Sequence, residues 1–233
     1  MLTVIADKII DDIAQITETT EINHIKNVFR LKENDEVRVI DFEYEYKGII
    51  KEINKKNILI SISDKKEDIY SLPLNLDLAI GLLKNEKMKL LIQKLTELGI
   101  RNIIPLKTER VVVKINEKKE KWDLVVRESM KQCRAIKKTN VEILNEIKRI
   151  KYGNYDKIIY AYESSESSLN LKEIVKKEDN NILLIIGPEG GFTQDEVKYL
   201  KSIGAIEISL GKRILRAETA AIVLAGSIIN IKE

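Results

Sequence analysis

The first seventy residues alternate apolar and polar positions in short runs, which is the period of a half-buried β-strand. Three such runs span residues 36–42, 44–53 and 57–63, and Asn, Asp and Lys residues separate them. Three short strands so close together are typical of a small barrel or a compact sheet. We therefore expect a β-rich unit over residues 1–72.

From residue 73 onward, apolar runs alternate with segments that have helical spacing. One of these segments places Met88, Leu91, Ile92 and Leu95 on one face of a helix and ends before Gly99. Expected strands cover 76–83, 102–106, 157–161, 181–186 and 205–210, and expected helices cover 86–98, 119–136, 169–177, 194–203 and 217–230. This alternation predicts an α/β domain over 73–233 with a mostly parallel sheet.

Composition narrows the classes of protein and site. One Cys excludes a disulfide framework, and one Cys with one His argues against a four-ligand zinc cluster, so only an all-carboxylate cation site stays open. The longest uncharged run has 13 residues, 219–231, which is shorter than the roughly 20 residues of a membrane span. Asp7, Asp11 and Asp12 interrupt any apolar leader. We expect a soluble cytoplasmic protein without a membrane partner.

Charge is unevenly spread along the chain. Residues 1–72 hold 11 basic and 15 acidic residues, whereas residues 84–151 hold 19 basic and 9 acidic residues. A basic block of this kind is the electrostatic pattern of a nucleic-acid-binding surface, but a solvated helix face produces the same pattern. Charge alone leaves both interpretations open.

A glycine-rich turn follows the apolar run 182–186. Its residues are Gly187, Pro188, Glu189, Gly190 and Gly191, and a Thr-x-x-Glu capping box at 193–196 then opens a helix. A turn between a strand and a helix can hold a cofactor through backbone groups, although an ordinary tight turn has the same signature. The turn has no Walker A or G-x-G-x-x-G motif and carries a carboxylate, so it favours adenosine or a cationic centre over a phosphate.

A second turn, residues 210–221, follows another apolar run. It contains Leu210, Gly211, Arg213, Leu215 and Arg216, and Glu218 and Thr219 begin the last helix. Glu218 complements the helix dipole or pairs with Arg216 in the purely structural interpretation. We expect the two turns at the carboxyl ends of two neighbouring strands, where open α/β sheets bind ligands.

Together, GPEGGF and LGKRILRAETA resemble the bacterial small-subunit ribosomal RNA (uracil-N3) methyltransferases, the RsmE family of the SPOUT superfamily. Further matching segments are HIKNVFR at 24–30, KNEKM at 84–88, QKLTELG at 93–99, Pro105, Glu109, Arg110 and ESMKQCR at 128–134. The resemblance implies a PUA-like β-barrel, an α/β domain with a deep trefoil knot, S-adenosylmethionine as methyl donor, and a homodimer. It also implies small-subunit ribosomal RNA as the partner. We expect this RNA in the assembled subunit, although the sequence leaves naked RNA open as the substrate.

The resemblance assigns roles to individual residues. It implies two cofactor loops, formed by Gly187, Pro188, Glu189, Gly190, Gly191, Leu210, Gly211, Leu215 and Thr219. We expect contacts with RNA at His24, Arg30, Lys84, Arg110 and Arg134.

The implied reaction needs particular chemistry. Uracil N3 is a weak acid with a pKa of roughly 9 to 10, close to that of a tyrosine hydroxyl. A guanidinium can stabilise the N3 anion, so Arg216 is the first candidate and Arg213 the second. Glu218 or Glu189 could accept the proton. Two alternatives remain: a SPOUT enzyme that methylates a ribose 2′-hydroxyl, and an RNA-binding assembly factor without catalytic activity.

Overall fold

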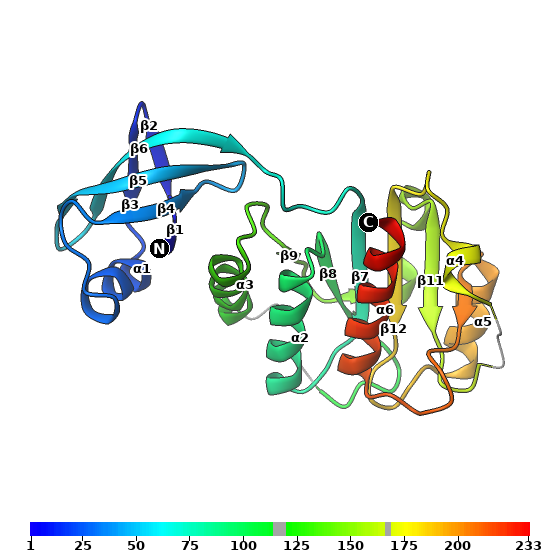
Figure 1. The fold of residues 1–233 in the computed structure, drawn as a ribbon. Helices are drawn as coiled ribbons and strands as arrows, with labels where there is room; N and C mark the ends of the chain where they lie inside the picture. The colour runs from blue at the N-terminus through cyan, green and yellow to red at the C-terminus, as the bar shows by residue number, and fades with distance from the viewer. Residues whose placement is uncertain (114–119, 166–168) are drawn as a thin grey trace. The chain divides into compact units, whose positions relative to one another are not determined.

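The computed structural model describes residues 1–113, 120–165 and 169–233. It divides the chain into two compact units (Figure 1). The first comprises Met1–Ser71 and Met130–Lys138, and the second comprises Leu72–Ser129 and Thr139–Glu233. Each unit has its own sheet and its own hydrophobic core, and each is described by itself below.

Six strands build the first unit. They are β1 (Leu2–Ile5), β2 (Lys8–Ile10), β3 (Ile13–Ile16), β4 (Glu36–Ile40), β5 (Tyr44–Ile53) and β6 (Ile58–Glu67). They pair in the order β1-β4-β5-β6-β3-β2, and only the β1–β4 pair is parallel. The three predicted strands of this region are confirmed as β4, β5 and β6. Alternate residues such as Val37, Val39, Ile58 and Ile60 are fully buried, as the period of two requires.

The pattern did not predict the first three strands or the helical segment that follows them. Strands β1, β2 and β3 have only three or four residues, which is too few for an alternation to show. Asp11, between β2 and β3, adopts a φ of 50° and permits their tight turn. A short helix α1 (Thr19–Asn23) continues into a π-helix η1 (His24–Val28).

Seven parallel strands form the sheet of the second unit. They are β7 (Asn75–Gly81), β8 (Asn102–Lys107), β9 (Asn140–Val141), β10 (Asn145–Glu146), β11 (Lys157–Ala161), β12 (Asn181–Ile186) and β13 (Ile206–Ile208). The order is β10-β8-β7-β12-β11-β13, and β9 also pairs with β8. The predicted α/β class with a parallel sheet is confirmed. Strand β12 is apolar and buried from Ile182 to Ile186 because both of its faces are covered.

Helices cover both faces of this sheet (Figure 1). The helices of this unit are α2 (Asn85–Glu97), α4 (Leu171–Ile174), α5 (Gln194–Ser202) and α6 (Ala217–Lys232), with 3-10 turns η2 (Ile147–Arg149) and η3 (Tyr152–Asn154). Helix α3 (Glu120–Cys133) begins in this unit, and its last four residues belong to the first unit. Helices α2 and α6 contact each other, and α6 packs on β7 and β12. Val197 and Leu200 of α5 pack with Leu183 and Ile185 in the core of the opposite face.

Several element boundaries differ from the pattern; for example, α3 ends at Cys133 instead of residue 136, and β13 covers Ile206–Ile208 instead of 205–210. Helix α4 is shorter than the predicted 169–177, because Asn170 caps its start and Val175 is already extended. Lys119, at the predicted start of α3, lies outside the described residues.

One expectation about topology was wrong. The two predicted loops follow β12 and β13, which we expected to be neighbours, but β11 lies between them. Strand β11 pairs with β12 on one side and with β13 on the other. The site is therefore built on three adjacent strand ends instead of two.

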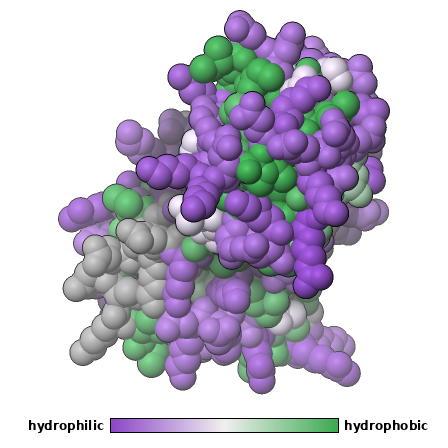
Figure 2. All heavy atoms as spheres, turned by 90° about the vertical axis from the view of Figure 1, so that its left-hand side faces the viewer, coloured by the Kyte–Doolittle hydropathy of each residue, from purple (hydrophilic) through white to green (hydrophobic). Residues whose placement is uncertain are grey.

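Much of the surface is hydrophilic, and Figure 2 shows small apolar groups lying between polar ones. Exposed apolar side chains of the first unit include Val28 and Phe29, at 59% and 47% exposure. In the part of the chain that the structure describes, none of the helices combines the length and apolar character needed to cross a membrane.

Candidate functional site

A cavity of about 530 Å³ lies at the carboxyl ends of β12, β11 and β13. This is the edge where parallel sheets of α/β proteins bind ligands. The lining comes from both predicted loops, from the end of β11, from one residue of α2 and from two residues of α6. The lining residues are Lys87, Ala161, Tyr162, Glu163, Ile186, Gly187, Pro188, Glu189, Gly190, Gly191, Ser209, Leu210, Gly211, Arg213, Ile214, Leu215, Arg216, Ala217 and Ala220.

The first loop is a tight turn that keeps its backbone close to its neighbours. The amide of Gly191 donates to the carbonyl of Pro188 over 2.9 Å, and Gly191 has a φ of 68°, which favours glycine. A Cβ at Gly187 would contact the backbone of Phe192 at 3.3 Å. A Cβ on Gly81, at the end of β7, would collide with the backbone of Pro188. Glycine at these positions therefore allows the turn to lie against the sheet edge.

The second loop joins β13 to α6. Gly211 adopts a φ of 113°, and its amide donates to the hydroxyl of Ser209 over 3.3 Å. Leu215 is half-buried, whereas Arg213 and Arg216 are exposed. Arg216 is the extended N-cap residue of α6, where the helix presents free backbone amides.

The end of β11 contributes residues that the sequence analysis missed. Ala161, Tyr162 and Glu163 line the cavity between the two loops. A Cβ at Gly191 would collide with the carboxylate of Glu163, so that carboxylate lies directly against the first loop. The sequence indicated these residues only weakly, because their place in the cavity follows from the position of β11 between β12 and β13.

Two basic residues hold the first loop from outside. Lys87, in the first turn of α2, forms an ion pair with Glu189, and both side chains are partly exposed. The guanidinium of Arg110 donates to the carbonyl oxygens of Gly190 and Phe192 over 3.2 and 3.4 Å. Arg110, which we expected to contact RNA, therefore contacts the glycine turn.

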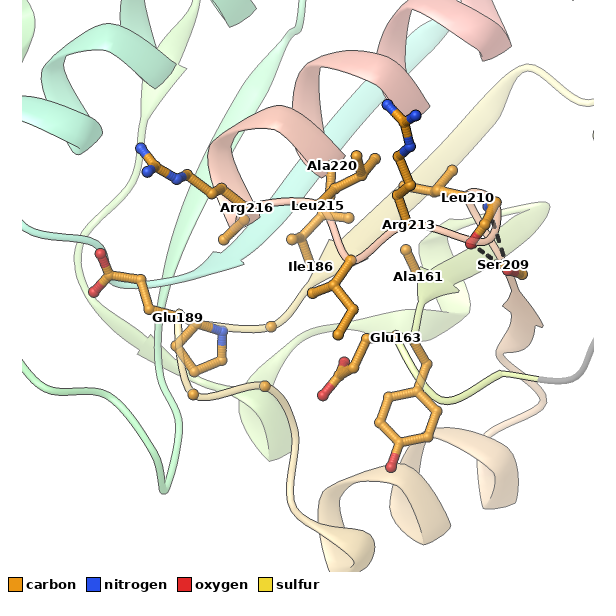
Figure 3. A pocket seen from close by; sticks show the side chains of 18 of the residues that line it. Ala161, Glu163, Ile186, Glu189, Ser209, Leu210, Arg213, Leu215, Arg216 and Ala220 are labelled. Atoms are coloured by element: carbon orange, nitrogen blue, oxygen red, sulfur yellow. Dashed lines mark hydrogen bonds between the residues drawn. The ribbon is translucent and has the colours of Figure 1, made fainter.

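The two arginines expected to be catalytic line the cavity but point elsewhere. Figure 3 shows the guanidinium groups of Arg213 and Arg216 extending away from the carboxylate of Glu163. Within residues 1–113, 120–165 and 169–233, neither guanidinium has a hydrogen-bond or ion-pair partner. Both are therefore available to an anionic ligand.

Glu218 and Thr219 do not line the cavity. Glu218 is 8% exposed, and its Oε2 has no hydrogen-bond partner among the described residues. The alternative of an ion pair between Glu218 and Arg216 was wrong, because these two described residues form none. Thr219 is exposed on the first turn of α6.

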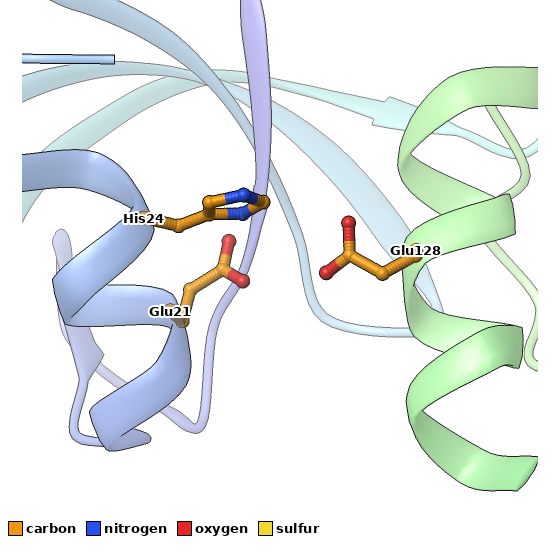
Figure 4. A group of neighbouring side chains, drawn as sticks. All are labelled: Glu21, His24 and Glu128. Carbon is orange, nitrogen blue, oxygen red and sulfur yellow. The ribbon is translucent and has the colours of Figure 1, made fainter. Parts of the chain in front are cut away.

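The residues expected to bind RNA are distributed over both units. In the first unit, His24 contacts the ring of Phe29 edge-on at 5.5 Å, and Arg30 follows with a φ of 54°. Figure 4 shows Glu21 and His24 projecting from the same helical segment. Glu21 is buried and pairs with Lys131 of the same unit at 2.7 Å.

The remaining RNA candidates have exposed side chains. Lys84 precedes α2 in the second unit, where it is the N-cap residue. Arg134 belongs to the first unit, has a φ of 62°, and accepts a hydrogen bond from Arg38 through its carbonyl. The side chains of both residues are thus accessible to a partner.

The cavity has the chemistry of a nucleoside site. Apolar side chains of Ile186, Leu215 and Ala220 can contact a base, and the glycine turn offers backbone groups at close range. Charged groups are confined to its rim and to Glu163 (Figure 3). This arrangement suits a ligand with a planar apolar part and a few polar groups.

Comparison with known proteins identifies relatives over the whole chain. The family described as "RNA methyltransferase domain" matches residues 70–229, and that described as "RNA methyltransferase PUA domain" matches residues 16–63. The "Ribosomal RNA small subunit methyltransferase E" of Bacillus subtilis (strain 168) is 30% identical over 86% of this chain and 83% of its own. The protein of the same name from Buchnera aphidicola subsp. Schizaphis graminum is 35% identical over the same shares.

A solved structure shares the fold. It is a ribosomal RNA small subunit methyltransferase E from Neisseria gonorrhoeae bound to S-adenosyl methionine, with a TM-score of 0.87, 21% identity, and coverage of 99% of this chain and 98% of that chain. At that identity the likeness concerns the fold alone. The matches to the family and to its curated members confirm the resemblance drawn from the two loops. The chain therefore belongs to the ribosomal RNA small subunit methyltransferase E family of RNA methyltransferases.

Proposed function

We propose that this protein is an S-adenosylmethionine-dependent methyltransferase that methylates N3 of one uridine in small-subunit ribosomal RNA. The observation that carries the proposal is that both loops line the same cavity. Two segments about twenty residues apart in sequence meet there, at the edge of a parallel sheet. Membership of the family supplies the class of reaction and of substrate.

The cavity fits the proposed cofactor. Gly81, Gly187 and Gly191 let the first loop pack closely against its neighbours, and the backbone of that loop then lines the cavity. Leu210, Gly211 and Leu215 would hold the nucleoside from the opposite side, with Pro188, Glu189 and Gly190 completing the first loop. Thr219 would act only through the start of α6. When bound, the cofactor supplies an electrophilic methyl group on a positively charged sulfur.

The residues of this chain would stabilise the uracil anion. As the bond from N3 to the methyl carbon forms, the carbon–sulfur bond breaks and its electron pair stays on sulfur. Negative charge on the uracil lies at N3, O2 and O4. The guanidinium of Arg216, which has no partner among the residues that the structure describes, is our first candidate to stabilise it. Arg213 is the second candidate.

The N3 proton must leave before or during the transfer. Glu189 lines the cavity and could receive it, with Lys87 fixing the carboxylate in place. Glu218 is the alternative base, because its buried Oε2 has no partner among the described residues. Holding both reactants in one cavity would supply much of the acceleration, since the two then react as one molecule.

We also infer the finer features of the family for this chain. These are a PUA-like barrel over 1–72, a trefoil-knotted domain over 73–233, a homodimer in the cytoplasm, and the assembled small subunit as substrate. RNA would contact His24, Arg30, Lys84 and Arg134, whose side chains are half-buried or exposed. Arg110 would act indirectly, through the glycine turn.

The test uses small ribosomal subunits that lack the modification. They are incubated with the full chain and methyl-labelled cofactor, the RNA is digested, and the labelled nucleoside is identified by mass spectrometry. We expect N3-methyluridine at one position. A labelled ribose 2′-O-methyl nucleoside would replace the proposed reaction with the alternative one. No label together with no calorimetric binding of S-adenosylmethionine would leave an RNA-binding protein without catalytic activity.

A further inference from the structure

Glu163 is a charged residue in the cavity to which the proposed reaction gives no task. It lies two residues after the end of β11 and is exposed. Its carboxylate lies against Gly191 and, in Figure 3, extends into the space between the two loops. Within the described ranges, the carboxylate has no hydrogen-bond or ion-pair partner. An acceptor placed in this way is free to interact with a bound ligand.

The other charges of the cavity do not neutralise Glu163. Lys87 and Glu189 pair with each other, and the guanidinium groups of Arg213 and Arg216 extend away from Glu163 (Figure 3). The remaining lining near it is apolar or backbone, from Ala161, Ile186 and the glycine turn. The interior of the cavity therefore carries a local negative charge, while its basic groups lie at the rim.

We propose that Glu163 is a specificity-determining residue that distinguishes the methyl donor from the demethylated product by charge. This inference rests on the proposed function. S-adenosylmethionine carries a positive sulfonium, whereas S-adenosylhomocysteine carries a neutral thioether and is otherwise almost the same molecule. Both ligands carry the same amino-acid ammonium and carboxylate groups, so only the sulfonium of the donor adds an attraction to a carboxylate in the cavity. That attraction favours the donor and promotes exchange of the spent product.

Coulomb's law sets the size of the effect. For two unit charges about 4 Å apart that remain largely hydrated, so that the dielectric constant of water applies, the attraction changes a binding constant by roughly 3- to 10-fold. The exposure of Glu163 places the expected effect within this modest range, because solvent and salt screen it. Such a preference is enough to reduce product inhibition where donor and product are both present.

The test is calorimetric binding of three ligands to the full chain and to Glu163→Gln. The substitution removes the charge but keeps the shape and an acceptor oxygen. We expect the Kd of S-adenosylmethionine to rise roughly 3- to 10-fold and that of S-adenosylhomocysteine to stay within 2-fold. Sinefungin, in which a charged amine replaces the sulfonium, should weaken as the methyl donor does. The matched control, Glu173→Gln on α4, removes an exposed carboxylate outside the cavity and should change none of the three.

The possible outcomes separate this inference from the proposed function. If the unsubstituted chain binds neither S-adenosylmethionine nor the product, the proposed function itself fails. If the unsubstituted chain binds both and Glu163→Gln weakens both equally, Glu163 contacts a group that the two ligands share, and charge discrimination is refuted. Unchanged affinities, or a loss of turnover at unchanged affinities, would refute it as well.

Discussion

At the level of single residues, the cavity depends on glycines whose missing side chains leave room for other atoms. Gly81 leaves room for the backbone of Pro188, and Gly191 leaves room for the carboxylate of Glu163. Gly190 faces Arg110 instead, since a Cβ there would lie 3.0 Å from the Arg110 Cβ and 3.2 Å from its carbonyl oxygen. The shape of the first loop is thus fixed jointly by β7, β11 and the segment that follows β8.

Gly190→Asp should abolish cofactor binding. The new side chain would displace Arg110 or the turn itself, and its charge would add to the local negative charge of Glu163. Calorimetry with S-adenosylmethionine measures the effect, and we expect no detectable binding. The control is Gly226→Ala in α6, where a Cβ meets nothing within 4 Å. That control should bind normally and gain about 0.5–1 kcal/mol of stability. Unchanged affinity in Gly190→Asp would refute the assignment of this loop.

Arg216→Ala should lower kcat far more than it weakens cofactor binding. The guanidinium is exposed, lines the cavity and has no partner among the described residues, so its loss removes transition-state stabilisation without disturbing the fold. Loss of one such electrostatic stabiliser typically costs about 100-fold or more in kcat. Lys212→Ala, a neighbouring cation outside the cavity lining, is the control and should keep most of its activity. Equal turnover in both variants would remove Arg216 from the mechanism.

At the level of elements, the start of α5 fixes the far end of the first loop. Thr193 accepts from the amide of Glu196 over 3.3 Å, and Glu196 accepts from the amide of Thr193 over 2.8 Å. Glu196 also accepts from the backbone amide of Glu109 over 3.0 Å. The capping box expected from Thr-x-x-Glu is confirmed, and it also ties the helix to the segment after β8.

Thr193→Ala should reduce the free energy of unfolding by about 1 kcal/mol, because an amide at the start of α5 loses its acceptor. Urea unfolding followed by circular dichroism measures the change. Thr193→Ser keeps a hydroxyl acceptor and should remain within about 0.5 kcal/mol of the original chain. An equal loss in the two variants would show that the Thr193 methyl group, which both lack, and not the cap, stabilises this segment.

Asp156 should contribute to acid sensitivity. The backbone amides of Asn181 and Asn180 donate to its carboxylate and lower its pKa below the ordinary value of 3.8. A lowered folded-state pKa means that this stabilisation is fully present above the unfolded-state pKa, and is lost as the pH falls through the folded-state pKa. Asp156→Asn should therefore show a shallower fall in thermal midpoint between pH 5 and pH 2, whereas a parallel fall would assign the acid sensitivity to other carboxylates.

The sequence allowed much of the second unit to be predicted. Long periodic or wholly apolar segments such as β12, α2 and α5 were expected nearly at their observed bounds. Strands of two or three residues, such as β9 and β10, carry too little pattern, and strand order depends on pairing between distant segments. For this reason the two loops could be predicted from the sequence, but Glu163, which lies between them in the cavity, could not.

At the level of the whole molecule, the charged residues are distributed much less evenly than the net charge of +3 suggests. Residues 1–72 carry more acidic than basic residues, whereas residues 84–151 carry twice as many basic as acidic ones. Lys84 and Arg134 belong to this block and have exposed side chains. If RNA phosphates contact the block, binding should release counterions in proportion to the cations engaged.

Lys84→Ala and Arg134→Ala should each weaken RNA binding and reduce its dependence on salt. A plot of log K against log salt concentration should lose about 0.7–0.9 of its slope for each phosphate contact removed. Fluorescence anisotropy with a small-subunit RNA fragment at several salt concentrations measures this slope. Lys55→Ala, an exposed cation between β5 and β6 in the acidic region, is the matched control and should leave the slope unchanged. If Lys55→Ala lowers the slope as much as the other two variants, phosphate contact is spread over the whole surface. In that case the long-range electrostatic field of the protein, and not a defined basic surface, determines where RNA binds.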